Sequence, residues 1–187
     1  MDVRPGRTWD LPSVDSWIPY YFDVTLERYA VPDGTNGIRI RRATDDVELS
    51  RLRDPARAVR LLYGFSPNGR YLAATYREQQ HWTVWDVPAA RIVLDDPRCR
   101  HGITFSREGD QLAASHSDGR ILRYDLRTGV ETASVKTGRP VDWLSLSASG
   151  ERVLGCDRLG GKEIGVWTFA TTNALTLTAP DRLDNAD

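Results

Sequence analysis

The sequence predicts an all-β protein made of four consecutive four-stranded units, and three observations lead to this fold class. A marker residue followed by a polar turn recurs in steps of 43, 40 and 41 residues, at Phe22, Phe65, Phe105 and Leu146. After each marker come short segments rich in Val, Ile, Leu, Thr and aromatic residues, bounded by turn formers, as in β-strands. No run of eleven or more residues has convincing helical apolar spacing.

Each unit holds four expected strands, of which the first ends near the marker. The second segments are RYAV, YLAATY, QLAASH and ERVLGC, and the first of these lacks a preceding turn glycine. The third segments are IRIRR (38–42), WTVWD (82–86), ILRYD (121–125) and IGVWT (164–168). The fourth segments are VELSRL (47–52), ARIVL (90–94), VETASV (130–135) and ALTLT (174–178).

Glycine marks the turn between the first and second strand in three units. Gly69, Gly109 and Gly150 stand where a hairpin turn needs a positive φ. Because a single twisted sheet of four strands cannot bury both of its faces, we expect the units to stack face to face around an axis.

Three of the units resemble WD40 repeats, the blades of a β-propeller family. The resemblance is carried by FSPNGRYLAA…VWDV (65–87), FSREGDQLAASHSDGRILRYDL (105–126) and LSASGERVLGC…VWTF (146–169). It implies a tight SDG turn at 117–119, in which Asp118 accepts backbone N–H groups beside Gly119. It also implies that Trp85, Tyr124 and Trp167 occupy the position of the family's aromatic residue on the third strand.

The chain departs from the family pattern at several positions. The family's Gly-His dipeptide is missing from every unit, and Ala114 stands where the second strand often carries Ser or Thr. The Asp–His–Ser–Trp hydrogen-bond network of many family blades is therefore expected to be incomplete here. The divergent repeats resemble those of bacterial WD40 proteins.

The repeats divide one propeller domain into blades. The expected divisions are an N-terminal segment (1–16), which could end another blade, blade 1 (17–53), blade 2 (54–95), blade 3 (96–135), blade 4 (136–178) and a C-terminal tail (179–187). Family rings usually close with seven or eight blades, so we expect an open arc. Three arrangements are open: a fragment of a longer protein, which we favour, a head-to-tail homodimer that completes an eight-bladed ring, or a tight four-bladed ring.

Composition excludes several classes of partner. The chain has 187 residues, 40% of them hydrophobic, and a net charge of −1, so it lacks the basic field of a nucleic-acid-binding protein. No apolar run approaches the ~18 residues of a membrane span, and the N-terminal MDVRPGRTWDLP has no apolar segment behind it, as a signal peptide would. Cys99 and Cys156 stand far apart, and the sequence has no CxxC motif and no Cys/His cluster. This pattern argues against a zinc site, and we expect no other cofactor. It also argues against a disulfide framework, so we expect a cytoplasmic location.

Motifs that suggest catalysis have simpler explanations. GCDRLGGKE (155–163) fails the phosphate-loop pattern, because Glu follows the lysine and no helix follows the loop. The sequential His116, Ser117 and Asp118 are better explained by turn chemistry than by a catalytic triad. The pairs Asp45–Asp46 and Asp95–Asp96 are interpreted as solvated turn residues. We therefore expect no catalytic residue.

The function that the sequence predicts is a non-enzymatic scaffold that binds a protein or peptide through the rim of its loops. Candidate binding residues are Arg77, Glu78, His81, Arg98, Arg100, His116, Arg139, Trp143 and Arg158. Arg and Trp are the residue types that anchor interfaces, and the long 76–81 loop is the most individual feature. The alternatives are an enzyme or ligand-binding propeller with a site in the central channel, or purely structural blades of a larger multidomain protein.

Overall fold

The part of the chain that the structure describes contains sixteen β-strands in four antiparallel sheets. The structure is a computed structural model, which describes residues 21–33, 36–54, 57–76, 81–156, 163–170 and 174–178. Sheet 1 comprises β1 (Tyr21–Phe22), β2 (Arg28–Pro32), β3 (Gly37–Arg42) and β4 (Glu48–Arg53). Sheet 2 comprises β5 (Val59–Phe65), β6 (Tyr71–Tyr76), β7 (Trp82–Asp86) and β8 (Arg91–Asp95).

The two remaining sheets repeat this plan. Sheet 3 comprises β9 (Cys99–Phe105), β10 (Gln111–His116), β11 (Arg120–Asp125) and β12 (Val130–Lys136). Sheet 4 comprises β13 (Trp143–Leu146), β14 (Arg152–Cys156), β15 (Glu163–Thr168) and β16 (Ala174–Thr178). In every sheet the strands are hydrogen-bonded in chain order, so each sheet is an antiparallel meander.

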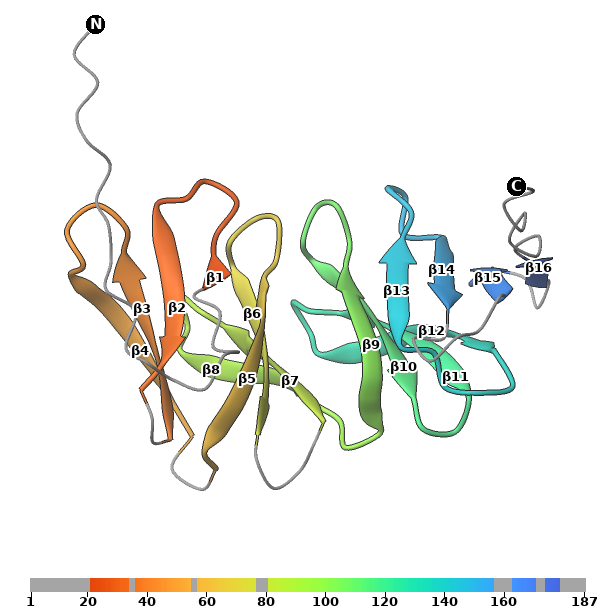
Figure 1. Ribbon diagram of the computed structural model, residues 1–187, viewed down its shortest axis with the longest axis horizontal. Helices are drawn as coiled ribbons and strands as arrows, with labels where there is room; N and C mark the ends of the chain where they lie inside the picture. Colours follow the sequence, from red (N-terminus) through yellow and green to blue (C-terminus); the bar gives the residue numbers. More distant parts are fainter. Residues whose placement is uncertain are drawn as a thin grey trace, which may run out of the picture.

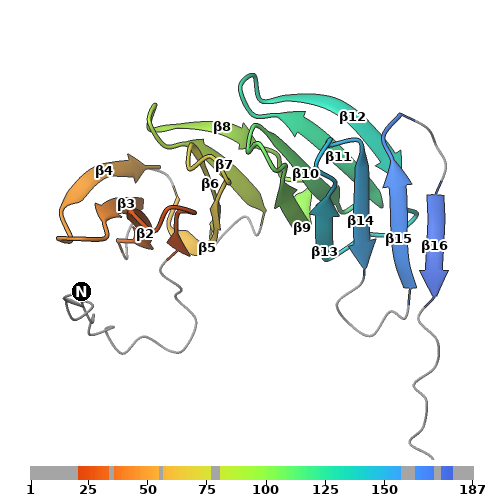
Figure 2. The same cartoon turned by 90° about the horizontal axis from the view of Figure 1, so that it is seen from above.

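The four sheets follow one another along an open arc, as Figure 1 and Figure 2 show. In Figure 2 the first strands β5 and β9 lie on the concave side, and the last strands β4, β8 and β12 lie on the convex side. The predicted fold class, all-β with about four four-stranded units in an open arrangement, is confirmed.

Apolar residues of neighbouring sheets make the core. Ile38, Ile40 and Leu52 of sheet 1 pack in one cluster with Leu72 and Trp85 of sheet 2. A second cluster lies between sheets 2 and 3, and a third lies between sheets 3 and 4. Each interface excludes water from both partners, which gives the stacked sheets the stability that one sheet lacks.

The second strand of a sheet contributes to two of these clusters at once. Along β6, Leu72 and Ala74 belong to the cluster with sheet 1, whereas Tyr71 and Ala73 belong to the cluster with sheet 3. Since successive side chains of a strand point to opposite faces, a strand buried on both faces is mostly apolar. This explains why YLAATY shows no polar alternation.

Turns after the first strands link each sheet to the next. Arg28 of sheet 1 donates to the Gly69 carbonyl oxygen at 3.1 Å, and Asn68 of sheet 2 donates to the Glu108 carbonyl oxygen at 2.8 Å. Arg123 of sheet 3 donates to the Gly150 carbonyl oxygen at 2.7 Å. The described residues contain no helix that could cross a membrane.

Candidate functional site

The connections between sheets meet the turns between second and third strands along one edge of the arc. The Asp54 amide donates to the Asn36 carbonyl at 3.0 Å, the Ser117 amide to that of Arg98 at 3.2 Å, and the Thr137 amide to that of Gly119 at 2.8 Å. We call this edge the loop rim; its described parts are residues 33, 36, 54, 57–58, 81, 96–98, 117–119 and 137–142.

Three predicted binding residues lie exposed at or beside the loop rim. Arg98 is exposed and its guanidinium pairs with the Asp96 carboxylate at 2.7 Å. Arg139 is exposed on the connection before sheet 4, and Trp143, the first residue of β13, is 61% exposed. Tryptophan is one of the residue types enriched among the anchors of protein interfaces, so the exposure of Trp143 keeps it a candidate binding residue.

Two predicted binding residues are not accessible. His81 is 3% exposed and His116 is fully buried, so neither side chain can contact a partner at the rim. His81 Nε2 lies 2.6 Å from an Asp95 carboxylate oxygen, and His116 points into the interface with sheet 2. Arg77, Glu78 and Arg158 lie outside the described residues, as do Gln79, Gln80 and Lys162 and the side chains of Arg100 and His101.

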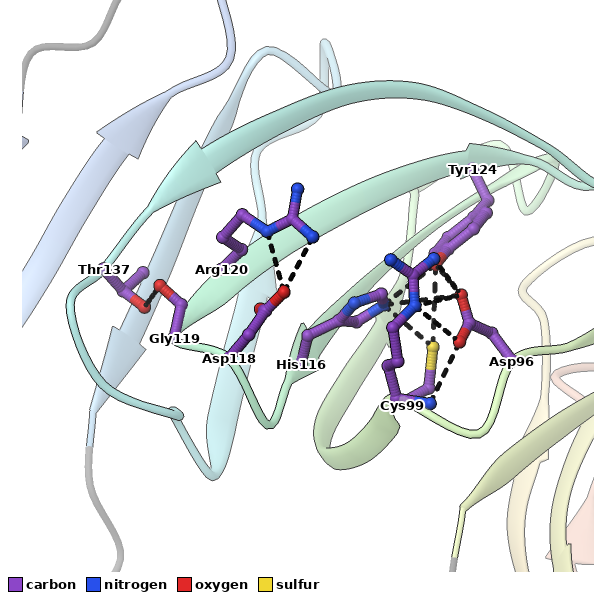
Figure 3. A network of polar contacts seen from close by, with 9 residues as sticks. Asp96, Cys99, His116, Asp118, Gly119, Arg120, Tyr124 and Thr137 are labelled. Atoms are coloured by element: carbon purple, nitrogen blue, oxygen red, sulfur yellow. Dashed lines mark hydrogen bonds and ion pairs between the residues drawn. The ribbon is translucent and has the colours of Figure 1, made fainter.

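The buried histidine belongs to a polar cluster of Asp96, Cys99, His116 and Tyr124 (Figure 3). His116 Nε2 lies 3.2 Å from Cys99 Sγ and 2.9 Å from the Tyr124 hydroxyl oxygen. The Tyr124 hydroxyl donates to Asp96 Oδ2 at 3.0 Å, and it lies 3.7 Å from Cys99 Sγ. Asp96 also accepts hydrogen bonds from the guanidinium and the backbone amide of Arg98.

Burial determines the charge of this polar cluster. It raises the pKa of the Cys99 thiol to about 12, raises the pKa of the Tyr124 hydroxyl, and lowers the pKa of the His116 imidazole. Burial also raises the pKa of the Asp96 carboxyl, but hydrogen bonds from Arg98 and Tyr124 outweigh it and bring that pKa to about 2. At neutral pH the cluster therefore holds one anion, Asp96, paired with Arg98.

Sheet 2 has a simpler arrangement at the equivalent positions. Tyr76 ends β6 as His116 ends β10, and Trp85 faces Leu72 across the strand pair as Tyr124 faces Leu112. The Trp85 indole N–H donates to the Tyr76 hydroxyl at 3.0 Å. Side chains other than the family's Asp–His–Ser–Trp set thus connect the second and third strands here.

Asp96 differs from the sequence interpretation as a solvated turn residue, whereas Asp95, the last residue of β8, is exposed but held in ion pairs. The Asp96 side chain is only 13% exposed and holds Arg98 and Tyr124, and Asp95 pairs with Arg57 at 2.7 Å as well as with His81. A sequence pattern could have indicated the pairing of Asp96 with Arg98: an Asp is followed within three residues by an Arg, just before the first strand of a sheet. The same pattern recurs at Asp54 and Arg57, which are also hydrogen-bonded.

The turn residues singled out in the sequence have a definite backbone geometry. Gly69, Gly109, Gly119 and Gly150 have φ of +67°, +76°, +74° and +74°. The turn at 117–119 is closed by the Gly119 amide, which donates to the His116 carbonyl oxygen at 3.2 Å. The Asp118 carboxylate accepts the Arg120 guanidinium at 2.7 Å, away from the polar cluster in Figure 3.

The two ends of the arc carry different side chains. The face of sheet 4 that points away from sheet 3 exposes Trp143, Leu154, Ile164 and Leu175, which we call the terminal face of sheet 4. Trp167, on the opposite face of β15, packs toward the core shared with sheet 3.

The face of sheet 1 that points away from sheet 2 carries three arginines beside the aromatic pair Phe22 and Tyr29. It carries Arg39, Arg41 and Arg51, and Arg41 replaces the aromatic residue of the other third strands. Arg41 pairs with Asp46 at 2.7 Å, Arg51 with Asp33 at 3.4 Å, and Arg39 with Glu48 at 3.9 Å. We call these residues the terminal face of sheet 1.

Comparison with known proteins identifies the fold. No family model and no curated protein matches the chain. Among solved structures, the chain is similar to the β-propeller domain of Cps50 (Swd1) from Myceliophteria thermophila, with a TM-score of 0.57 and 17% identity. The chain has the β-propeller fold. The match covers 80% of this chain and 51% of that domain, so the chain spans about half the length of the propeller that it resembles.

Proposed function

We propose that this chain is a non-enzymatic propeller scaffold that binds another protein, as the WD40 resemblance implies. The observation that carries the proposal is the terminal face of sheet 4, where four large apolar side chains are between 37% and 61% exposed. The equivalent faces of sheets 2 and 3, which point to the next sheet along the arc, are buried in sheet-to-sheet interfaces. A face of this composition matches the interior of a propeller, so its complement is another apolar sheet.

The two terminal faces argue against a head-to-tail pair of these chains. Such a ring would press the terminal face of sheet 4 onto Arg39, Arg41 and Arg51 of a second copy. Removing those guanidinium groups and their carboxylate partners from water costs several kcal/mol per ion, and an apolar face offers no hydrogen bonds to offset that cost. The proposed occupant is therefore a further propeller blade, supplied by a longer polypeptide or by another protein.

Substitution on the terminal face of sheet 4 tests this assembly. Leu154→Glu places a charge in the centre of the face, whereas Val130→Glu places one at an equally apolar site, 58% exposed, on the last strand of sheet 3. We expect the wild-type chain to bind an apolar dye, Leu154→Glu to lose most of that binding, and Val130→Glu to keep it. Equal dye binding by both variants would contradict the proposal.

Solution mass separates the second-copy arrangement from the proposed one. We expect light scattering to give the isolated chain a mass other than that of a dimer held by both terminal faces. A mass of twice 21.1 kDa that Arg41→Glu and Leu154→Glu each reduce to one chain would establish the head-to-tail ring and overturn our proposal.

We propose that the partner also contacts the loop rim beside this face. Arg139 and Trp143 lie where the loop rim adjoins the terminal face of sheet 4, and both are exposed. We expect Arg139→Ala and Trp143→Ala each to weaken capture of the partner at least about tenfold, the effect of an interface anchor. The matched control is Arg127→Ala, whose side chain is 62% exposed in a turn between the last two strands of sheet 3. Unchanged capture by both rim variants would remove the rim from the proposal.

A cytoplasmic location is part of the proposal. Cys99 and Cys156 are both free thiols, and free thiols persist in a reducing compartment.

A further inference from the structure

The polar cluster places four potential metal ligands around one point. Asp96 comes from the connection before sheet 3, Cys99 from the start of β9, His116 from the end of β10 and Tyr124 from β11. The ligand atoms of Asp96, Cys99 and His116 all lie within 4.8 Å of one another. Because these residues come from separate elements, no sequence spacing marks them, and from the sequence we expected no metal site.

The distances between the donor atoms suit a tetrahedral ion. Bonds of the lengths found at zinc sites place neighbouring ligand atoms roughly 3.2–3.7 Å apart. Here Cys99 Sγ and His116 Nε2 are 3.2 Å apart, and His116 Nε2 and Asp96 Oδ2 are 3.9 Å apart. The Tyr124 hydroxyl lies 2.9 Å from the His116 nitrogen, at the fourth corner. All three ligand atoms lie within 4.8 Å of one another, so local side-chain shifts would bring the set to ligand geometry.

The fold does not need this set of residues. In sheet 2 a single hydrogen bond between Tyr76 and Trp85 connects the same strand positions, and Val59 takes the position of Cys99. A structural link alone therefore explains neither the thiol nor the imidazole in sheet 3. The combination of a sulfur, a nitrogen and a carboxylate oxygen is the donor set of zinc-type ions rather than of magnesium or calcium.

We propose that Asp96, Cys99 and His116 bind a divalent transition-metal ion, with zinc as the best fit and the Tyr124 hydroxyl or a water molecule as the fourth ligand. Binding replaces the Cys99 S–H bond with a sulfur–metal bond and releases that proton to solvent. The resulting thiolate and the Asp96 carboxylate balance the two positive charges of the ion, so the buried complex is neutral.

Neighbouring groups are compatible with the bound state. His116 Nδ1 has no hydrogen-bond partner among the described residues, so the ring can carry its proton there while Nε2 holds the ion. Arg98 donates to both Asp96 oxygens and would orient the carboxylate from outside the site. The Asp96 and Arg98 side chains are 13% and 47% exposed, so the ion can enter where the connection reaches the surface.

Cobalt(II) titration of the metal-free chain tests the proposal, because a cobalt–thiolate bond gives a charge-transfer absorption that other ligands do not. We expect one equivalent of cobalt to produce this band and one equivalent of zinc to abolish it. Cys99→Ser should remove the band, and Cys156→Ser, which changes the chain's other cysteine, should keep it. Asp96→Asn should weaken binding at least about tenfold while the thiolate band remains at saturating cobalt.

Circular dichroism of each variant guards against loss of fold. If Cys99→Ser does not fold, His116→Gln and Asp96→Asn take its place. Their zinc uptake is then measured by equilibrium dialysis, with Cys156→Ser again as the control. Absence of a stoichiometric thiolate band in the wild-type chain, or its persistence in folded Cys99→Ser, would overturn the proposal. The site does not depend on the scaffold role, so either proposal can fail alone.

Discussion

Two buried tyrosine hydroxyls with different surroundings allow a direct test of the polar cluster. Tyr124 is 3% exposed, and its hydroxyl contacts both His116 and Asp96. Tyr71 is fully buried at the same interface, and its hydroxyl has no hydrogen-bond partner among the described residues. Tyr124→Phe and Tyr71→Phe therefore remove the same atom from two buried sites of which only one is hydrogen-bonded.

The free energy of unfolding should fall in Tyr124→Phe and should not fall in Tyr71→Phe. Tyr124→Phe removes the hydroxyl that Asp96 and His116 share, although Arg98 still donates to Asp96, and the loss costs about 1–3 kcal/mol. For a chain of this size, a loss of about 2 kcal/mol lowers the melting temperature by roughly 4–8 °C. Tyr71→Phe removes an unsatisfied polar group, so stability should stay unchanged or rise by up to about 1 kcal/mol.

Urea denaturation followed by far-ultraviolet circular dichroism measures both changes. A chelator is included so that hydrogen bonding is measured apart from any bound ion, and equal m-values would show that the unfolding reaction is the same. If Tyr71→Phe destabilises the chain as much as Tyr124→Phe does, the hydrogen bonds of the polar cluster contribute nothing measurable and the reasoning is refuted.

Two further predictions concern the turns. Gly129 and Gly138 have φ of +73° and +76°, but a Cβ on Gly129 would lie 2.3 Å from the Val93 carbonyl oxygen, whereas one on Gly138 meets nothing within 4 Å. In thermal melts Gly138→Ala should cost about 1 kcal/mol and Gly129→Ala clearly more, and equal costs would rule out the steric contribution. Burial raises the pKa of the Asp23 carboxyl, but hydrogen bonds, chiefly from Arg28, outweigh it and hold that pKa below its ordinary value. The contribution of Asp23 is thus full above about pH 4 and lost as pH falls through the lowered pKa, so Asp23→Asn should destabilise the chain at pH 7 and lose its effect in acid.

The sequence by itself determined the repeat, its strands and its turns. Phe65 and Phe105 with their following turns, the strand residues after them and Gly69 and Gly109 are local signals, since β-propensity and a positive φ depend on few neighbouring residues. The burial of YLAATY on both faces was found only in the stacked sheets. The open arc was predicted from the number of repeat units, which can be counted along the sequence.

The candidate sites depended on the tertiary structure. His116 looked like a rim residue beside Ser117, but the last residue of β10 points into the sheet-to-sheet interface and cannot reach a partner. Asp96 looked like a solvated turn residue, yet the register of β9 with β10 places it beside Cys99 and His116. Side-chain direction at a strand end and contacts between strands depend on pairing, twist and stacking, none of which a short segment encodes.

The contrast between the ends of the arc combines both levels. Arg41 in the first unit and Trp167 in the fourth are visible in the sequence as unlike members of one repeat position. Only the stacked sheets show that Arg41 lies on a charged terminal face, whereas Leu154 on the last sheet lies on an apolar one. The physical reason is that strand alternation assigns residues to two faces, but only the stacking order decides which face has a neighbour.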